Sequence, residues 1–354
     1  MLKCCMRLGE VPLHLYQITA GFELLRRSGK IELAVERISP LSRHRLPYNM
    51  LEVQVGDQAV IFDMNDGYDN LLKPFENYRD LYNGILKKCD FLYKRSYSDE
   101  WNAGLEKPEK IKKIAPNYFV TVKGNPAHRP SPCDPGREKL KKIYRLLPST
   151  QYFNGRYLAD SFYSPPVVHS EPKILFMARL WDPKGEYKGQ LTEQKSEERK
   201  EINEVRAKCI RACRSEFGTR FYGSVAPSEF SASEYPDLVA EDSTATKKNE
   251  YIKRMKDSDI LIATAGLHHS TGWKFAEYLA ASKAIVSEPL YYESAGSLAD
   301  GRNYLSFRNE NECCERISGL FDERKRLEMM QENAAYYNEF LNCESLVTRA
   351  IQRL

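Results

Sequence analysis

The 354-residue sequence lacks the features that mark several large classes of protein. No apolar run approaches the roughly 20 residues that a membrane-spanning helix needs, and the amino terminus has no apolar core of a signal peptide. The nine cysteines include no C-x-x-C pair, and their odd number argues against a disulfide framework and against a zinc site. We therefore expect a cytoplasmic protein whose cysteines stay reduced.

An excess of charge of one sign is also missing. The 53 lysines and arginines nearly balance the 49 aspartates and glutamates, which leaves a net charge of +4. This charge is too small to argue for a nucleic-acid partner. It fits an anionic small ligand, and it leaves open a peripheral association with an anionic membrane at its cytoplasmic face.

The pattern of apolar segments predicts two α/β domains. A chain of this length usually forms two domains, and the proline-rich segment 164–172 reads as the linker between residues 1–165 and residues 166–354. In the first half we expect strands at 31–35, 51–55, 59–62, 90–94 and 117–122. We expect helices there at 13–27 and 78–88. Short apolar strands that alternate with helices favour a parallel sheet covered on its faces.

The second half shows the same alternation more clearly. We expect strands at 174–178, 221–223, 259–264 and 284–287, a charged loop at 185–199, and helices at 202–217, 250–256 and 272–282. Gly218 supplies the stop of the first of these helices. Such a series predicts a doubly wound sheet, in which ligands bind beyond the carboxyl ends of the strands.

Two cations follow the first strand of this second half. Arg179 offers a bidentate fork to phosphate oxygens, and Lys184 offers a point charge. Together they are suited to neutralise a diphosphate leaving group. The alternative is an ordinary solvated loop, because loops after strands are often charged.

A second candidate segment, residues 266–272, lies between a strand and a helix. Glycines here, Gly272 among them, let the backbone approach a ligand, and the amino terminus of the helix attracts an anion. Ser270 or Thr271 is the expected cap. Lys274 lies in the first turn and Glu277 one turn later, where a carboxylate can accept hydrogen bonds from ribose or sugar hydroxyls. The alternative is a surface ion pair between these two side chains.

Two further candidates are weaker. His268 and His269 have no third ligand at a suitable spacing, so we expect no metal. In the first half, Asp66 belongs to an acidic turn after the strand at 59–62, where a carboxylate can act as a general base. The alternative is a turn that caps the next helix, and His14 reads as a helix residue at the domain surface.

These motifs resemble the nucleotide-binding domain of GT-B glycosyltransferases, above all the retaining group 1 family. That family opens the domain with Gly-Arg-Leu-x-x-x-Lys-Gly, and the spacing is matched here by Ala178-Arg179-Leu180-Trp181-Asp182-Pro183-Lys184-Gly185. The family then carries an acid-x7-acid segment followed by Ala-x-Gly-x-Pro-Val, and residues 277–286 are similar to the second half of that stretch. The likeness covers about residues 172–345, and it differs at His269, which takes the place of the first acid.

The resemblance implies an α/β protein with two Rossmann-like domains facing across a cleft, with the last helix crossing back to the first domain. It implies that Arg179 and Lys184, with Gly272 and Lys274, hold the donor diphosphate, and that Glu277 holds the ribose. His269 would contact the donor sugar or its leaving phosphate. No metal or other cofactor is expected, because the cations and the helix end take that role.

The sequence therefore predicts a glycosyltransferase that moves a sugar from a nucleotide-diphosphate sugar to a glycan or lipid-linked acceptor, in polysaccharide or glycoconjugate biosynthesis. Two alternatives stay open. His269 in place of an acid is compatible with a non-catalytic protein that binds a nucleotide sugar and recruits a partner. A sugar-nucleotide epimerase of the same fold is the other.

Overall fold

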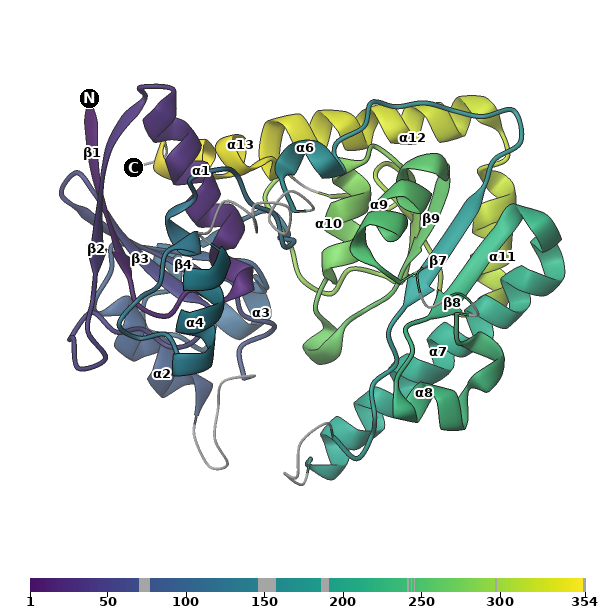
Figure 1. Cartoon of the computed structure of the whole chain (residues 1–354), viewed down its shortest axis with the longest axis horizontal. Helices are drawn as coiled ribbons and strands as arrows, with labels where there is room; N and C mark the ends of the chain where they lie inside the picture. Colours follow the sequence, from purple (N-terminus) through teal and green to yellow (C-terminus); the bar gives the residue numbers. More distant parts are fainter. Residues whose placement is uncertain are drawn as a thin grey trace. The chain divides into compact units, whose positions relative to one another are not determined.

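A computed structural model describes residues 1–69, 77–145, 157–185, 191–240, 242, 244, 246–296 and 298–352 of the chain (Figure 1). The chain divides into two compact units. Unit 1 comprises Met1–Ser161, Tyr292–Ser297 and Tyr337–Leu354, and unit 2 comprises Phe162–Tyr291 and Leu298–Tyr336. Both units are built on a sheet that is flanked by helices, so the chain has the expected α/β class.

Unit 1 contains a six-stranded mixed sheet in the order β2-β1-β3-β4-β5-β6. Its strands are β1 (Leu2–Leu8), β2 (Ile31–Arg37), β3 (Met50–Val55), β4 (Gln58–Asp63), β5 (Phe91–Lys94) and β6 (Ile111–Lys113). β3 runs antiparallel to both neighbours, whereas the other pairs are parallel. The expectation of a parallel sheet was therefore wrong for this half.

A two-residue hairpin turn explains the antiparallel strand. Gly56 and Asp57 connect β3 to β4, and Gly56 has φ of 56°. Glycine followed by aspartate between two alternating apolar runs is a hairpin signal, since a tight turn needs a residue that tolerates positive φ. The strand expected at 117–122 was also wrong: the edge strand is β6, and the later segment is irregular apart from one bridge between Thr121 and Leu158.

Two helices from opposite ends of the chain pack together in unit 1. α1 (Tyr16–Arg27) lies beside α13 (Cys343–Ile351) (Figure 1). Gly21 permits this contact, because a Cβ built there would lie 2.1 Å from the carbonyl oxygen of Cys343. The described part of unit 1 also contains the α-helices α2 (Tyr78–Leu86), α3 (Asp99–Asn102), α4 (Gly136–Arg145) and α6 (Ala159–Phe162), the last of which ends in unit 2.

Unit 2 contains a five-stranded sheet in the order β11-β10-β9-β7-β8, and all its pairs are parallel. The strands are β7 (Ile174–Ala178), β8 (Phe221–Val225), β9 (Ile260–Ala263), β10 (Ala284–Ser287) and β11 (Leu305–Ser306). The four strands expected in this half are confirmed. Their continuous burial agrees with strands that are covered on both faces.

The helices of unit 2 include a 25-residue helix, α7 (Glu193–Phe217), which ends at Gly218 with φ of 53°. The charged loop was expected to run over residues 185–199, of which residues 186–190 lie outside the part of the chain that the structure describes. Residues 193–199 belonged to that expected loop. They are helical instead, because Thr192 caps the helix by accepting from the backbone N–H of Lys195. The remaining helices are α8 (Glu229–Glu234), α9 (Lys248–Asp257), α10 (Trp273–Ala280), α11 (Glu310–Gly319) and α12 (Glu323–Tyr336).

All nine cysteines are free thiols. Within the part of the chain that the structure describes, no helix combines the length and the apolar character needed to cross a membrane.

Candidate functional site

Three loops leave the carboxyl ends of neighbouring parallel strands in unit 2. Residues 179–185 follow β7, residues 264–272 follow β9, and residues 288–290 follow β10. The carboxyl ends of parallel strands meet at one edge of a sheet, which is where α/β proteins bind ligands. The candidate residues Arg179, Lys184, His269, Gly272 and Lys274 lie in these loops or directly after them.

The loop after β7 is fastened to α7. Asn203 accepts from the N–H of Trp181 at 2.9 Å and donates to its carbonyl oxygen at 2.7 Å. Arg199 donates to the carbonyl oxygen of Asp182 at 2.6 Å. The guanidinium of Arg179 is exposed and lies 4.5 Å from the centre of the Trp181 ring. The loop is therefore held in place while one of its two predicted phosphate ligands faces solvent.

Lys184, the second predicted phosphate ligand, is also exposed. Its backbone N–H donates to the Asp182 carboxylate at 2.8 Å, and Gly185 follows with φ of 91°. This turn brings the chain away from the strand and leaves the ammonium group in water. Both cations are thus accessible to a ligand.

The buried side chain of Arg206, on α7, joins two of the loops. Its guanidinium donates to the carbonyl oxygens of Arg179 and of Ala265, and to the hydroxyl of Thr264. Burial lowers the pKa of Arg206 to about 10, and the nearby carboxylate of Glu288 opposes this shift. Arg206 therefore remains charged at neutral pH and contributes positive potential beneath the site.

The loop after β9 has an unusual backbone. His268 has φ of 57° and His269 has φ of 54°, a left-handed region in which side chains other than glycine are strained. Hydrogen bonds hold this shape: Glu198 accepts from the N–H of His268 at 2.5 Å, and the N–H of Gly266 donates to the carbonyl oxygen of Ser270 at 2.8 Å. Strain of this kind is characteristic of functional loops.

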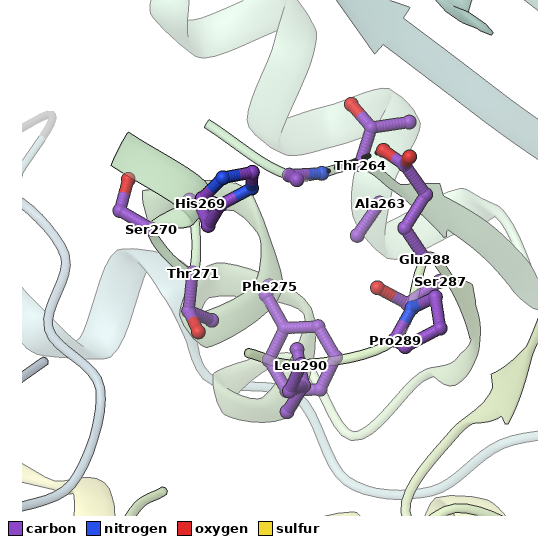
Figure 2. A pocket seen from close by; sticks show the side chains of 12 residues that line it. Ala263, Thr264, His269, Ser270, Thr271, Phe275, Ser287, Glu288, Pro289 and Leu290 are labelled. Atoms are coloured by element: carbon purple, nitrogen blue, oxygen red, sulfur yellow. Dashed lines mark hydrogen bonds between the residues drawn. The ribbon is translucent and has the colours of Figure 1, made fainter. Parts of the chain in front are cut away.

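A small pocket lies between the loops after β9 and β10 (Figure 2). His269, Thr271 and Gly272 line it from one loop, and Glu288 lines it from the other. The space between these residues is much smaller than the pocket that a whole nucleotide sugar needs. The His269 ring also packs against Tyr291, with 5.1 Å between ring centres.

Glu288 is a carboxylate that the sequence did not single out. Its carboxylate accepts from the N–H of Ala265 at 2.8 Å. Burial raises the pKa of Glu288, while this hydrogen bond and the charges of Arg206 and His269 oppose the shift. The only sequence signal was its position directly after a buried parallel strand, where functional side chains often lie.

α10 begins at the rim of this pocket. Its N-cap is Gly272, and no side chain caps it, so the expected capping by Ser270 or Thr271 was wrong. Ser270 and Thr271 precede Gly272, so neither of them occupies the N-cap position. A helix amino terminus without a side-chain cap directs backbone N–H groups outward, which favours an anion.

Lys274 and Glu277, on the first turns of α10, share a cluster with two residues of α9. Glu277 is 3% exposed and accepts from Lys248 at 2.5 Å and from the Tyr251 hydroxyl at 2.6 Å. The ammonium of Lys274 lies 4.0 Å from the centre of the Tyr251 ring. The surface ion pair considered for Lys274 and Glu277 is therefore replaced by a buried one between Glu277 and Lys248.

The electrostatics of this cluster favour a bound anion. Burial lowers the pKa of Lys274 to about 8; Glu277 raises it, and the positive charges of Lys248 and Arg206 lower it further. Lys274 is thus subject to the positive charges of Lys248 and Arg206 and to the negative charge of Glu277. A multiply charged anion at the start of α10 would relieve the repulsion among the cations.

A second polar cluster lies at the carboxyl ends of β4 and β5 in unit 1. The guanidinium of Arg95 pairs with Asp66 and donates to Asn117 at 2.9 Å, and it also lies 3.2 Å from His14 Nδ1. Burial lowers the pKa of His14 to about 4, with the charge of Arg95 acting in the same direction and Asp66 opposing it. His14 is therefore neutral, lies in a short helix, and is partly exposed while it contacts other polar groups.

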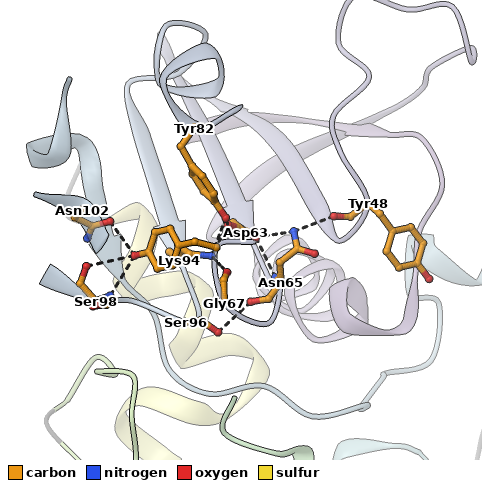
Figure 3. A network of polar contacts seen from close by, with 10 residues as sticks. Tyr48, Asp63, Asn65, Gly67, Tyr82, Lys94, Ser96, Ser98 and Asn102 are labelled. Atoms are coloured by element: carbon orange, nitrogen blue, oxygen red, sulfur yellow. Dashed lines mark hydrogen bonds and ion pairs between the residues drawn. The ribbon is translucent and has the colours of Figure 1, made fainter. Parts of the chain in front are cut away.

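A buried network supports the turn that carries Asp66 (Figure 3). Lys94 is fully buried and donates to Asp63 at 2.8 Å, to the carbonyl oxygen of Gly67 at 2.7 Å and to Tyr82 at 2.9 Å. The residue that caps α2 is Asn77, so the acidic turn does not serve as that cap. The carbonyl oxygen of Gly67 and the carboxylate of Asp66 instead bind Lys94 and Arg95, at the end of β5, and so hold the turn against that strand.

Among the residues that the structure describes, no group of three or more histidines, cysteines or acids is close enough to hold a metal ion. Asp66 belongs to unit 1 and the other candidates to unit 2.

Comparison with known proteins gives structural matches only. No protein-family model and no curated protein sequence matches the chain. The chain is similar to the solved structure of WaaG, a glycosyltransferase involved in lipopolysaccharide biosynthesis, with 12% identity, a TM-score of 0.46 and 98% of each chain covered. It is also similar to the carboxyl-terminal domain of a group 1 glycosyl transferase, LpcC of Francisella tularensis, with 13% identity and a TM-score of 0.31, over 51% of this chain and 95% of that one.

A third similar structure is the UDP-GlcNAc 2-epimerase of Neisseria meningitidis bound to UDP-GlcNAc, with 10% identity and a TM-score of 0.40, over 98% of this chain and 99% of that one. The structural neighbours thus include GT-B glycosyltransferases and an epimerase. At these identities and TM-scores the likeness assigns neither a family nor an activity to the chain.

Proposed function

We propose that the protein is a glycosyltransferase that takes a sugar from a nucleotide-diphosphate donor and passes it to a glycan or lipid-linked acceptor. The observation that carries this proposal is the cationic cluster at the start of α10. There, Lys274 lies in the first turn of a helix whose amino terminus no side chain caps, and the positive charges of Lys248 and Arg206 act on Lys274. Backbone N–H groups together with several cations are the combination that a diphosphate requires.

In this proposal the diphosphate lies at the start of α10. Lys274 and the backbone at Gly272 contact it, and the exposed side chains of Arg179 and Lys184 add charge from the loop after β7. As the bond to the sugar breaks, negative charge grows on the leaving diphosphate, and these groups stabilise it. The cations thereby take the role that a metal ion has in other transferases.

Glu277 is proposed to bind the ribose. Lys248 and Tyr251 each occupy one of its carboxylate oxygens, and a carboxylate has about four acceptor positions, so it can still accept from a ribose hydroxyl. The two partners orient the carboxylate before the ligand arrives. An oriented acceptor loses less entropy on binding than a mobile one.

His269 and Glu288 are proposed to contact the transferred sugar, because they line the pocket beside the start of α10. Glu288 supplies a carboxylate to a site in which histidine takes the position of the group 1 family's first acid. Asp66, oriented by Arg95, is proposed to position an acceptor hydroxyl.

Calorimetric titration with UDP, GDP, ADP and CMP tests the donor site. We expect one nucleoside diphosphate to bind, and the Lys274→Met and Glu277→Ala variants to weaken that binding at least about tenfold, which corresponds to one lost charge-assisted hydrogen bond. Lys256→Met, on α9, is the matched control because it lies outside the proposed donor contacts. Absence of binding by the wild-type protein to all four nucleotides would remove the proposal.

A transfer assay with sugar donors of the nucleotide that binds then tests catalysis. We expect Arg179→Ala and Glu288→Gln to lose transfer while the fold is retained. Near-normal turnover in Arg179→Ala would contradict its proposed role. Donor binding without transfer or hydrolysis would favour the non-catalytic alternative, for which His269 is the motivating residue, and conversion of the bound sugar without an acceptor would favour an epimerase.

A further inference from the structure

The strand β2 forms one edge of the sheet of unit 1. It is seven residues long, and its neighbour in the sheet is β1, to which it runs parallel. The N–H of Ile38, just past the strand, donates to the carbonyl oxygen of Leu8 at 3.1 Å. Along a parallel ladder, alternate residues bond to the same neighbour. The even-numbered residues of β2 therefore bond to β1, and the odd-numbered ones direct their N–H and C=O groups away from the sheet: Ile31, Leu33, Val35 and Arg37.

These outward backbone groups are open. Among the residues that the structure describes, none forms a hydrogen bond with them. The strand sequence contains no proline, and its register against β1 is unbroken from Ile31 to Arg37. Ala34 is exposed and Val35 is 38% exposed. A long edge strand with a regular backbone is a template on which another strand can pair.

The other described sheet edges are short or covered. In unit 2, Asp300 accepts from the N–H of Ser306 on β11 at 2.8 Å, and Arg316 donates to the carbonyl oxygen of Ser306 at 3.0 Å. At the opposite edge of that sheet, a bridge joins Val225 on β8 to Val239. In unit 1, the other edge strand, β6, has three residues, of which two are lysines. Such devices prevent strands from pairing with another chain. By contrast, β2 is long, and its edge is uncovered by any residue that the structure describes.

We propose that β2 pairs with β2 of a second copy of the chain, so that the sheets of two copies of unit 1 join. A two-fold axis perpendicular to the sheet makes the two strands antiparallel, and it keeps opposite side chains on the same face. Leu33 then bonds to Leu33 of the second copy, and Ile31 bonds to Val35. Cross-strand apolar pairs of this kind stabilise a sheet. The proposal does not depend on sugar transfer, because it rests on unit 1 alone.

The charges of β2 favour this register. Lys30, which precedes the strand, falls opposite Glu36 of the second copy, and the symmetry repeats this pair at the other end of the contact. Both side chains are exposed, and their ion pairs within the chain, with Glu344 at 2.7 Å and with Arg7 at 3.3 Å, are surface pairs of small energy. The next register would set Glu32 opposite Glu36, and like charges directly opposite each other are destabilising.

Analytical ultracentrifugation of the 354-residue protein across the micromolar range tests for the second copy. We expect an equilibrium between monomer and dimer. Hydrogen exchange at the amides of Leu33 and Val35 should be slower in the dimer, because their N–H groups face outward in the monomer and are bonded in the dimer. A protein that stays monomeric throughout would overturn the proposal, as would a dimer in which these amides exchange at the monomer's rate.

Charge reversal tests the register. Lys30→Glu and Glu36→Lys each set like charges opposite one another at both ends of the contact, so each variant should dimerise at least about tenfold more weakly. An equal mixture of the two variants should form a heterodimer, because every such pair then again has opposite charges. Lys88→Glu, at an exposed position of unit 1, is the control and should dimerise like the wild type. Unchanged dimerisation of either variant, or a mixture without a heterodimer, would contradict the proposal.

A backbone variant tests the hydrogen bonds of the contact. Leu33→Pro removes an outward N–H but no bond to β1, and proline is tolerated where the N–H of an edge strand faces solvent. We expect this variant to stay monomeric, whereas Leu33→Val, which keeps the N–H, should dimerise. The melting temperature shows whether Leu33→Pro is folded, and if it is not, the mixture of charge variants decides. A dimer that survives Leu33→Pro would place the contact elsewhere and overturn the proposal.

Discussion

The buried guanidinium of Arg206 donates a 2.9 Å hydrogen bond to the carbonyl oxygen of Ala265 and thereby fixes the loop after β9 to α7. A second donor of the same group reaches the carbonyl oxygen of Arg179, in the loop after β7. One side chain therefore sets the spacing of the two loops that carry the proposed phosphate ligands. The loop after β9 lies far from α7 in the sequence, since Ala265 follows Arg206 by 59 residues.

Replacing Arg206 with lysine should impair both stability and donor binding. Lysine is a point charge and cannot reproduce the planar fork that serves three acceptors. We expect the free energy of unfolding to fall by about 2–3 kcal/mol, the range for lost hydrogen bonds to a charged group, and nucleotide affinity to fall with it. Chemical denaturation and calorimetry measure the two effects. Arg211→Lys, at an exposed pair with Asp237 on the same helix, should change neither.

Donor affinity should depend on pH through Lys274. Its pKa of about 8 in the ligand-free protein means that the ammonium begins to lose its proton above that pH. A bound diphosphate favours the charged form, so binding is strongest below pH 8 and weakens by up to about tenfold per pH unit above it. Calorimetry between pH 6.5 and 9.5 measures this slope. Lys274→Arg should flatten it, and an unchanged slope in that variant would place the diphosphate elsewhere.

His14 should make the protein sensitive to acid. Its pKa of about 4 in the folded state lies below the ordinary value of 6.5, so the unfolded chain binds the proton first. Stability from this group is therefore complete above pH 6.5 and is lost as the pH falls toward 4, by on the order of 3 kcal/mol in total. His14→Asn should lessen the acid-dependent fall in melting temperature. A wild-type-like pH profile in the variant would show that His14 does not contribute.

The contact between α1 and α13 should tolerate no side chain at Gly21. A Cβ there would lie 2.1 Å from the backbone oxygen of Cys343, and backbone moves only if the helices separate. We expect Gly21→Ala to cost about 1–3 kcal/mol or more. Gly84→Ala on α2 is the control: nothing lies within 4 Å of its Cβ position, so the substitution should stabilise the helix by about 0.5–1 kcal/mol. Equal thermal shifts in the two variants would contradict the close packing.

Sequence periodicity was most reliable where strands are buried on both faces. Residues 174–178 and 284–287 are continuously apolar because the parallel sheet of unit 2 is covered on both sides, and both became strands. Periodicity failed at residues 193–199, which are helical. This first part of α7 is largely solvent-facing, so it has no apolar repeat, and Thr192 was the only signal of a helix start.

Some residues of the candidate site could likewise be predicted from local sequence patterns, and others could not. Arg179, Lys184, Lys274 and Glu277 were visible in the sequence because a spacing relative to a strand or helix marks them. Lys248 was not, because its role depends on α9 packing beside α10, and no local pattern encodes that contact. Glu288 and Arg206 were missed for the same reason.

The sequence by itself determined the α/β class, the parallel strands of unit 2 and the loops in which phosphate ligands are proposed to lie. Local spacing contains that information, since strand and helix periods are properties of neighbouring residues. Only the tertiary structure decided that Glu277 is paired with Lys248, that Arg206 joins two loops, and that β2 lies at an edge of its sheet. Each of these depends on which distant segments pack together, and therefore on the free energy of the whole chain rather than on any short stretch of it.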